Sequence, residues 1–241
     1  MKILIEKDYE SMSKAGSKIF IEAIKSNPKI VLGLATGSTP IGMYKEIIKS
    51  HKEEGLDFSN VRTFNLDEYV GLSGEHPSSY RYFMNNELFN HINIHQENIC
   101  IPDGKAEDLN EYCKKYDEMI EEAGGIDLLV LGIGEDGHIA FNEPGEYLSV
   151  ATNIAKLAES TIEVNSRFFN SIDEVPNTAI TMGMGNILKS KKIVLLANGV
   201  NKAPVIKELL KGDKVTPNLP VSFLLLHPDV TVIIDEAAYN G

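Results

Sequence analysis

The sequence predicts an α/β fold, a three-layer sandwich in which a mostly parallel, Rossmann-like sheet carries helices on both faces. Short apolar runs alternate with amphipathic stretches along the chain, which is the pattern of strands joined by crossover helices. The segment 126–131 is apolar apart from Asp127 and comes directly after two glycines. Such a run is typical of a strand that is buried on both faces, as in a parallel sheet.

Each predicted element follows from a local pattern. Strands are predicted at residues 3–5, 30–34, 61–66, 126–131, 179–182, 193–197 and 230–234. Helices are predicted after Asp8, after Thr39 and over 78–89, 109–123 and 201–211. Apolar residues recur there at helical spacing. Asp8 and Thr39 are residue types that cap helices, and Pro40 suits the first helical position.

Length and composition favour a single domain over residues 1–241. Of these residues, 43% are hydrophobic and 24% are charged, as in an ordinary soluble globular protein. No linker-like, repetitive or low-complexity stretch interrupts the chain. The stretch 146–176 is the least regular part and is a candidate for a mobile lid.

Charge and cysteine content limit the classes of partner. The formal net charge of −12 argues against a general nucleic-acid binder, which needs a basic face. The N-terminus does not have the pattern of a signal peptide, and no apolar run reaches membrane-spanning length. Cys100 and Cys113 lack the spacing of metal ligands and are expected to be reduced thiols. We therefore expect a cytoplasmic protein with a small-molecule substrate and no nucleic-acid or membrane partner.

Polar residues gather in three loops that leave predicted strands, at 35–40, 65–69 and 132–144. Ligands of parallel sheets bind beyond the carboxyl ends of the strands, so these loops are expected to form one site. The first loop lies in LATGSTP, where small residues, hydroxyls and a helix N-terminus suit a phosphate. A plain capped turn would show the same pattern, and the loop lacks the lysine of a Walker A motif.

The second loop places Asp67 and Glu68 just after a strand. Side chains alternate along extended backbone, so one carboxylate is expected to face the crevice and the other to face away. A carboxylate at this position can act as a general base. A solvated acidic turn is the alternative interpretation.

The third loop, LGIGEDGHIAFNEP, holds Asp136, His138 and Glu143 within one short segment. Two acids beside an imidazole are suited to proton transfer. The loop also contains the pattern G-x-G-x-x-G of dinucleotide-binding proteins, but no amphipathic helix and no clear ribose-binding acid follow it. Close approach of the backbone to a sugar or a phosphate is the better interpretation of the glycines.

The remaining charged residues point to an anionic ligand and not to a metal. His91 and His95 have no third ligand nearby in the sequence, so no metal site is predicted. Arg167 and Lys202 are candidate partners for a phosphate, although each alone would be an ordinary surface residue.

With these motifs assembled, the chain resembles the glucosamine-6-phosphate deaminase family nearly end to end. The matching segments are LATGSTP at Leu34, FNLDEYVGL at Phe64, EHPSSY at Glu75, GEDGHIAFNEP at Gly134, NSRFF at Asn165 and NGVNKAP at Asn198. The related 6-phosphogluconolactonases share the fold and an Asp-Gly-His step, but they lack the Phe-Asn-Glu-Pro and Asp-Glu-Tyr-Val-Gly segments found here.

This resemblance implies conversion of glucosamine 6-phosphate to fructose 6-phosphate and ammonia, without metal or organic cofactor. It implies that His138 opens the sugar ring, that Asp136 and Glu143 orient the imidazole, and that Asp67 takes the proton from carbon 2. It implies a phosphate site made of Thr36, Gly37, Ser38, Thr39, Arg167 and Lys202. The alternatives are a 6-phosphogluconolactonase-like hydrolase and a non-catalytic sugar-phosphate sensor.

The chain departs from the larger, allosteric members of this family. They carry an arginine and a lysine where this chain has Asn153 and Ala155, and they continue well beyond the position of Asp235. We therefore expect a monomer that is not activated by N-acetylglucosamine 6-phosphate. The segment around Arg167 resembles the mobile lid of the family.

Overall fold

The computed structural model describes all residues of the chain, 1–241, and contains a seven-stranded sheet in which every pairing is parallel. The strands, in their spatial order, are β1 (Lys2–Glu6), β10 (Val230–Asp235), β9 (Lys192–Ala197), β6 (Leu128–Leu131), β2 (Val31–Leu34), β3 (Arg62–Asn65) and β5 (Ile99–Cys100). The predicted strands at 3–5, 30–34, 61–66, 126–131, 193–197 and 230–234 lie in this sheet. The short edge strand β5 was not predicted.

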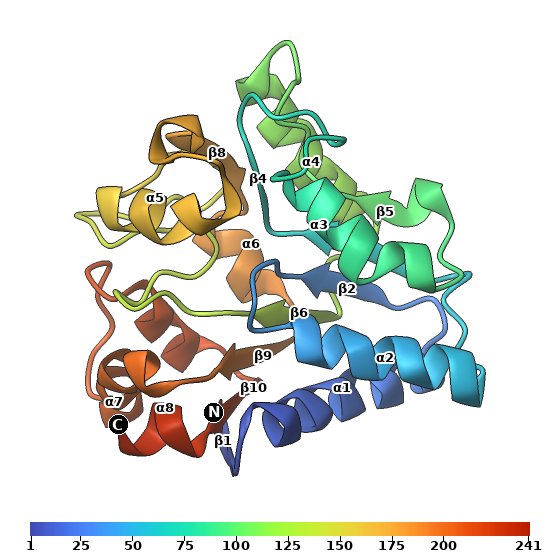
Figure 1. Cartoon of the computed structure of the whole chain (residues 1–241), viewed down its shortest axis with the longest axis horizontal. Coiled ribbons are helices and arrows are strands. Elements are labelled where there is room, and N and C mark those ends of the chain that lie inside the picture. Colours follow the sequence, from blue (N-terminus) through green and yellow to red (C-terminus); the bar gives the residue numbers. More distant parts are fainter.

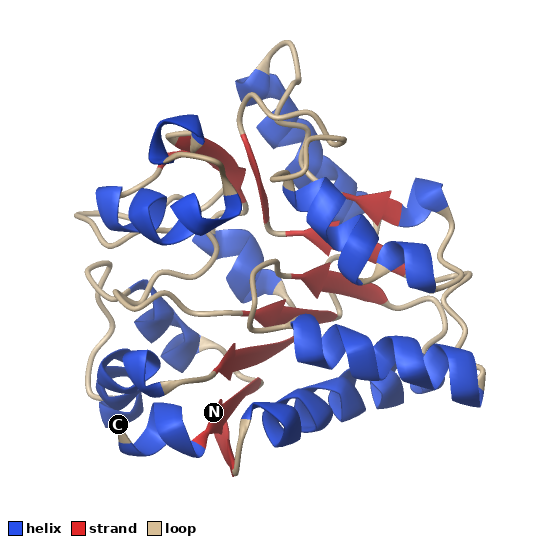
Figure 2. Cartoon of the chain, viewed as in Figure 1, coloured by secondary structure: helices blue, strands red, loops and turns tan.

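Helices surround this sheet, as Figures 1 and 2 show. They are α1 (Tyr9–Ser26), α2 (Ile41–Glu54), α3 (Tyr80–Glu87), α4 (Leu109–Glu122), α5 (Glu159–Asn165), α6 (Met184–Lys189), α7 (Ala203–Lys211) and α8 (Glu236–Asn240). One cluster of 50 buried residues extends from α1 and α2 through the central strands to α7. The expected α/β fold with a mostly parallel sheet is thereby confirmed.

A second, antiparallel sheet was not predicted, and it corrects the assignment of residues 179–182. Its strands, in spatial order, are β4 (Asp67–Tyr69), β8 (Thr178–Thr181) and β7 (Asn153–Lys156). The chain changes sheets at Leu66, whose N–H donates to Leu34 of β2 while its carbonyl accepts from Met182. Apolar patterning alone does not distinguish a strand of one sheet from a strand of the other.

The N-terminus of α2 differs from the prediction. Pro40 occupies the cap position, and no side chain of the preceding residues caps the helix. The Tyr9 hydroxyl instead accepts from the N–H of Gly42 at 2.8 Å and donates to the Ser38 carbonyl at 3.0 Å. Thr39 is therefore not the cap, because a tyrosine from α1 satisfies the free donor of α2. By contrast, Asp8 caps α1 as predicted and accepts from the Ser11 N–H.

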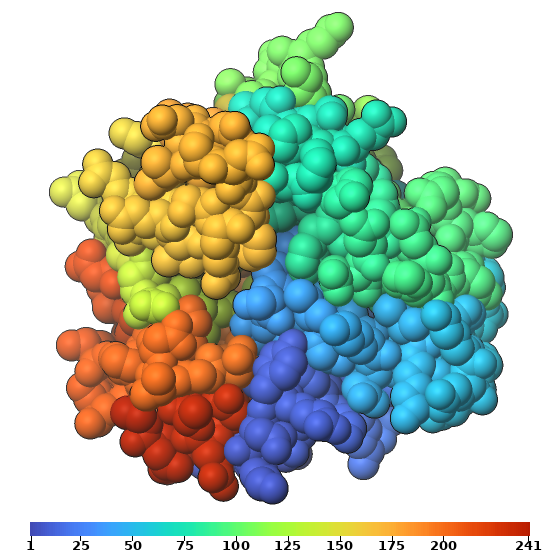
Figure 3. Space-filling view, in the orientation of Figure 1, coloured from blue at the N-terminus to red at the C-terminus, as the bar shows by residue number.

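The segment 146–176 is more regular than predicted. It contains β7, α5 and two short 3₁₀ turns, η3 (Ser166–Phe168) and η4 (Ile172–Glu174). In Figure 3 the yellow and gold part of the chain stands as a lobe beside the blue-green α3 region. A hydrogen bond from the Ser78 hydroxyl to the Phe168 carbonyl joins the two at 2.7 Å. No helix in the structure has both the length and the apolar character needed to cross a membrane.

Candidate active site

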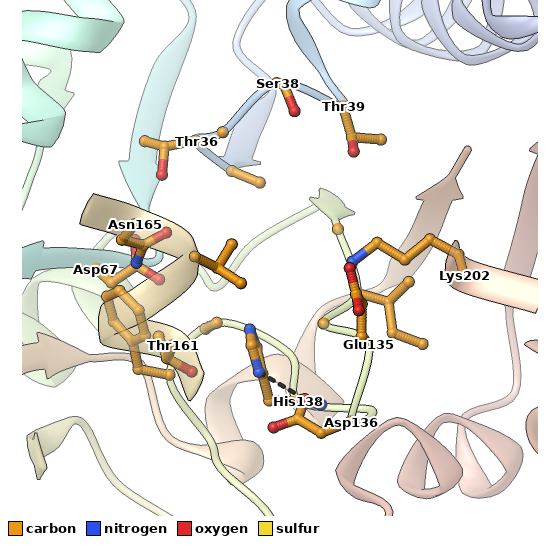
Figure 4. Close-up of a pocket in the computed structure, with 18 of the residues that line it drawn as sticks. Thr36, Ser38, Thr39, Asp67, Glu135, Asp136, His138, Thr161, Asn165 and Lys202 are labelled. Carbon is orange, nitrogen blue, oxygen red and sulfur yellow. Dashed lines mark hydrogen bonds and ion pairs between the residues drawn. The ribbon is translucent and has the colours of Figure 1, made fainter. Parts of the chain in front are cut away.

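The three predicted loops and both predicted cations line one cavity of about 390 Å³. This volume is within the range of small-molecule sites, roughly 300–1,000 Å³. The lining includes Thr36, Gly37, Ser38, Thr39, Asp67, Asp136, His138, Arg167 and Lys202. Figure 4 shows the loop after β2 on one side, His138 opposite it, Asp67 and Lys202 on the remaining sides. Glu143 lies outside the lining and contacts His138 from behind.

The loop after β2 presents backbone and hydroxyl donors to the cavity. Gly37 has a positive φ of 88°, and a side chain there would meet no neighbouring atom within 4 Å. Its conformation favours glycine. Thr39 donates its hydroxyl to the Asn198 side chain at 3.1 Å. This bond, with the Tyr9 contacts, holds the loop at the N-terminus of α2, where a helix dipole favours an anion.

Asp67 is the buried carboxylate of the cavity. Asp67 is 6% exposed, and its carboxylate accepts no hydrogen bond in the structure. Burial and the nearby charge of Glu68 raise the pKa of Asp67 to about 8, while His138 acts in the opposite direction. A carboxylate with a pKa near neutrality and without a competing partner is suited to general-base chemistry.

Glu68 points away from the cavity and has a structural role. Its carboxylate accepts from the backbone N–H groups of Tyr69, Tyr80 and Arg81, each at 2.9 Å. The last two belong to the first turn of α3, so Glu68 satisfies free donors at that helix N-terminus. The alternation along β4 thus gives the two neighbouring acids different tasks.

His138 lies between the carboxylates of Asp136 and Glu143. Its Nδ1 is 2.8 Å from Asp136 Oδ1 and 3.4 Å from Glu143 Oε2. Gly134 makes this packing possible, because a Cβ at that residue would lie 2.3 Å from two atoms of the imidazole and 2.7 Å from Asp136 Oδ1. With both acids at Nδ1, the other ring nitrogen, Nε2, is the one that can exchange a proton with a ligand (Figure 4).

The two carboxylates determine the charge of His138. Burial of the imidazole opposes its protonation, but Asp136 and Glu143 outweigh this effect and raise the pKa of His138 to about 9. The pKa of Asp136 is correspondingly lowered, since its ion pair with His138 outweighs its own partial burial. The imidazole is therefore mostly a cation at neutral pH.

The turn after His138 is held by distant elements. Ala140 adopts a positive φ of 53°, the one non-glycine residue with a positive φ in the chain. Asn142 donates to the carbonyls of Ile139 and Met182, and Thr181 accepts the N–H of Phe141. The bonds to Thr181 and Met182 fix the turn to the end of β8, and they offset the free-energy cost of its strained backbone. No helix follows; the next element is β7, which is incompatible with a dinucleotide-binding loop.

Two cations complete the cavity. Burial lowers the pKa of Lys202, whereas Glu135 and Asp136 act in the opposite direction. Lys202 is the last residue of the short turn η5 (Val200–Lys202). This turn directly follows Gly199, whose N–H donates to the side chain of Asp235 at 3.0 Å. Arg167 lies in η3, with its guanidinium carbon 4.8 Å from the centre of the Phe168 ring.

Several lining residues were not singled out by the sequence. They are Tyr80, Glu135, Phe141, Ser160, Thr161, Val164, Asn165, Asn198 and Asn201. The lining residues that stand beside a recognised motif could have been found by extending that motif, whereas Thr161 and Val164 carry no local signal.

Asp136, His138 and Glu143 have donor atoms within 4.8 Å of one another, close enough to share a metal ion. The same two carboxylates at Nδ1 also favour a proton on that nitrogen, and they raise the pKa of the imidazole.

Fold and cavity together define an α/β protein that surrounds a small-molecule site with acid–base groups and two cations. Residues 9–233 match the family model of glucosamine-6-phosphate isomerases and 6-phosphogluconolactonases. The chain therefore belongs to this family.

Its relatives include glucosamine-6-phosphate deaminases from two bacteria. That of Thermoanaerobacter pseudethanolicus is 59% identical over 238 residues, which are 99% of this chain and 94% of the relative. That of Clostridium perfringens is 57% identical over 99% of this chain and 98% of the relative.

Solved structures show the same relationship. A monomeric glucosamine-6-phosphate deaminase superposes with a TM-score of 0.97 at 44% identity, covering 100% of this chain and 99% of its own. The 6-phosphogluconolactonase of Trypanosoma brucei has a TM-score of 0.73 at 19% identity, covering 99% and 97% of the two chains. The second likeness shows the shared fold alone.

Proposed function

We propose that this chain converts glucosamine 6-phosphate and water to fructose 6-phosphate and ammonia. The observation that carries the proposal is the cavity in which a buried carboxylate and a cationic imidazole lie with two further cations. A relative that is 59% identical over nearly the whole chain has the name of this activity.

The phosphate of the substrate binds to the loop after β2 together with Arg167 and Lys202. The loop offers backbone N–H groups and the hydroxyls of Thr36, Ser38 and Thr39 beside the N-terminus of α2. These contacts are needed because the chain carries a net charge of −12 and the cavity contains several acids. A dianion would otherwise be repelled.

His138 opens the pyranose ring. The imidazolium donates a proton from Nε2 to the ring oxygen as the bond between that oxygen and carbon 1 breaks. The hydroxyl on carbon 1 releases its proton to water and becomes the aldehyde. Asp136 and Glu143 keep the imidazole charged and oriented for this transfer. General acid catalysis of this kind requires a pKa near the working pH.

Asp67 then removes the proton from carbon 2 of the open chain. The electron pair forms the double bond to carbon 1, and the aldehyde oxygen takes up a proton from water, which gives an enolamine. Asp67 returns its proton to carbon 1, which gives a protonated imine at carbon 2. Water adds to this imine and ammonia leaves, so that the ketone of fructose 6-phosphate remains.

Ammonia release is the direct test of this function. We expect purified protein to release one ammonia for each fructose 6-phosphate formed from glucosamine 6-phosphate. Absence of ammonia across a range of pH would refute the proposal. Acid production from 6-phosphogluconolactone above the spontaneous rate would instead support a lactonase, and binding of the amino sugar without conversion would support a sensor.

Removal of either cation is expected to raise KM more than it lowers kcat. A hydrogen bond to a charged group contributes about 1.5–3 kcal/mol, so Lys202→Ala or Arg167→Ala should raise KM roughly tenfold to hundredfold. Initial rates at varied substrate concentration measure both constants. A fall confined to kcat would place these residues at the reacting carbons and not at the phosphate.

The pH profile of kcat/KM is expected to be a narrow bell. Activity rises as Asp67 loses its proton near pH 8, the value to which burial raises its pKa. It falls as His138 loses its proton near pH 9, the pKa that Asp136 and Glu143 sustain against burial. Glu143→Gln removes one of the two negative charges beside His138. It should therefore lower the pH at which activity falls, which is the alkaline limb of the profile. An alkaline limb that stays in place in this variant would exclude His138 as its origin.

Three further expectations from the sequence remain proposals. We propose that the chain is a monomer, as is the solved deaminase that it matches at 44% identity, and light scattering measures its mass. We propose that 146–176 acts as a lid within one domain, since α5 and η3 contribute to the cavity wall. Slower hydrogen exchange of this segment with substrate bound would support the lid. The cytoplasmic location also stays a prediction, which cell fractionation tests.

A further inference from the structure

Glu143 receives a single hydrogen bond, and it comes from the helix α5. Thr161 of α5 donates its hydroxyl to Glu143 Oε1 at 2.7 Å. The other oxygen, Oε2, is the one 3.4 Å from His138 Nδ1. No other group in the structure donates to this carboxylate. The Glu143 carboxylate thus bridges a hydroxyl and the imidazole.

Thr161 is placed for this contact by the packing of its helix. Its residue is only 5% exposed. The following residue, Ile162, packs with Phe169 against the small buried cluster that contains Tyr69 and Phe141. These apolar contacts fix the face of α5 that carries Thr161, which also lines the cavity (Figure 4).

The same short segment carries a phosphate ligand of the proposed site. Arg167 lies in η3, which follows α5 directly. A displacement of α5 would therefore move the guanidinium and the hydroxyl donor of Glu143 together. The polar link from this segment to the imidazole runs through Thr161 and Glu143.

We propose that Thr161 is a positioning residue, whose hydroxyl holds Glu143 against His138 and thereby links the segment that carries Arg167 to the acid–base group. This inference rests on the proposed function for its effect on turnover. The contact itself does not depend on that function. A hydroxyl that donates to a carboxylate stabilises the ionised form and restricts its rotation.

The test compares Thr161→Val with Thr161→Ser. Valine has the shape of threonine without the donor, and serine keeps the donor. We expect Thr161→Val to lower kcat about tenfold, the effect of losing one charge-assisted hydrogen bond, with a smaller change in KM. Thr161→Ser should recover most of kcat. Thr152→Val is the matched control, because Thr152 is equally buried and its hydroxyl has no partner.

A readout independent of turnover is the titration of the His138 imidazole, followed by NMR in the unliganded enzyme and assigned with His138→Gln. Without the Thr161 hydroxyl, Glu143 is no longer held beside His138 and stabilises the charged imidazole less. Thr161→Val should therefore lower the pKa of His138. The other charged groups around the imidazole stay in place, namely Asp67, Glu135, Asp136, Arg167 and Lys202.

An unchanged or higher His138 pKa in Thr161→Val would overturn the inference, as would a Thr161→Ser variant no better than Thr161→Val. If Thr161→Val fails to fold, Thr161→Ala removes the same donor and carries the titration. A wild-type protein without ammonia release would refute the proposed function alone, because the titration would still decide the link between Thr161 and His138.

Discussion

Asp67→Asn is expected to abolish most turnover while the protein still binds the sugar phosphate. The amide has the shape of the carboxylate, but it cannot accept the proton from carbon 2. Loss of a positioned general base lowers kcat by roughly 10²–10⁴-fold. Stopped assays of ammonia measure the rate, and calorimetric titration with glucosamine 6-phosphate measures the affinity of the inactive variant.

Glu135→Gln is the control for this prediction. It also removes a negative charge from the cavity lining, yet Glu135 has no proposed role at carbon 2, and its carboxylate accepts from the Asn201 side chain. We expect this variant to keep most of its kcat. Near-normal kcat in Asp67→Asn would show that another group is the base.

Asp67→Asn should also stabilise the fold, by an amount that grows as the pH rises from 3.8 to about 8. Burial and Glu68 raise the pKa of Asp67 to about 8 from its ordinary value of 3.8. Between these values the folded state keeps a proton that the unfolded state has released, so the free energy of unfolding falls as pH rises. The asparagine variant escapes this loss. Thermal unfolding should show a larger gain in Tm at pH 8 than at pH 5, because only part of the loss has accumulated at pH 5.

Gly134→Ala is expected to lower kcat by about a hundredfold, because a displacement of a catalytic group by about 1 Å can have an effect of this size. The new Cβ would lie 2.3 Å from His138 Cε1 and Nδ1, so the imidazole must move. The residue has an ordinary φ, so backbone strain does not contribute. Kinetic constants and the NMR titration of His138 would show the displacement.

Gly145→Ala provides the comparison within the same loop region. Its Cβ would meet only backbone oxygens at 3.7 Å and 3.9 Å, which is ordinary contact. We expect near-normal kcat in this variant. An equal loss in both variants would indicate a general disturbance of the loop, and normal kcat in Gly134→Ala would show that the tight packing of His138 is not needed for turnover.

The parallel sheet could be predicted because its signal is local. Alternating apolar runs and helical stripes identify β2, β3, β6, β9 and β10 directly. The small sheet could not be predicted in this way. Strand β4 has three residues, and its pairing with β8 joins segments more than a hundred residues apart. The cap at Thr39 failed for a similar reason, since Tyr9 of another helix satisfies the donor of Gly42.

The sequence by itself determined the class of fold, the family resemblance and the kinds of group available for chemistry. Residue type and spacing express these properties directly. Strand alternation left open which of the two neighbouring acids faces the cavity, the resemblance implied Asp67, and only the tertiary structure gave the surroundings of each. Asp67 lies there buried and without a hydrogen bond, whereas Glu68 binds the N-terminus of α3.

The tertiary structure also decided the charge of His138 and the contact of Glu143 with Thr161. Both depend on burial and on distances between side chains from separate elements. A pKa follows from the surroundings of a group and not from its identity. Composition and spacing therefore listed the acids and the imidazole, and the packing of β4, α5 and the loop after β6 determined what each of them can do.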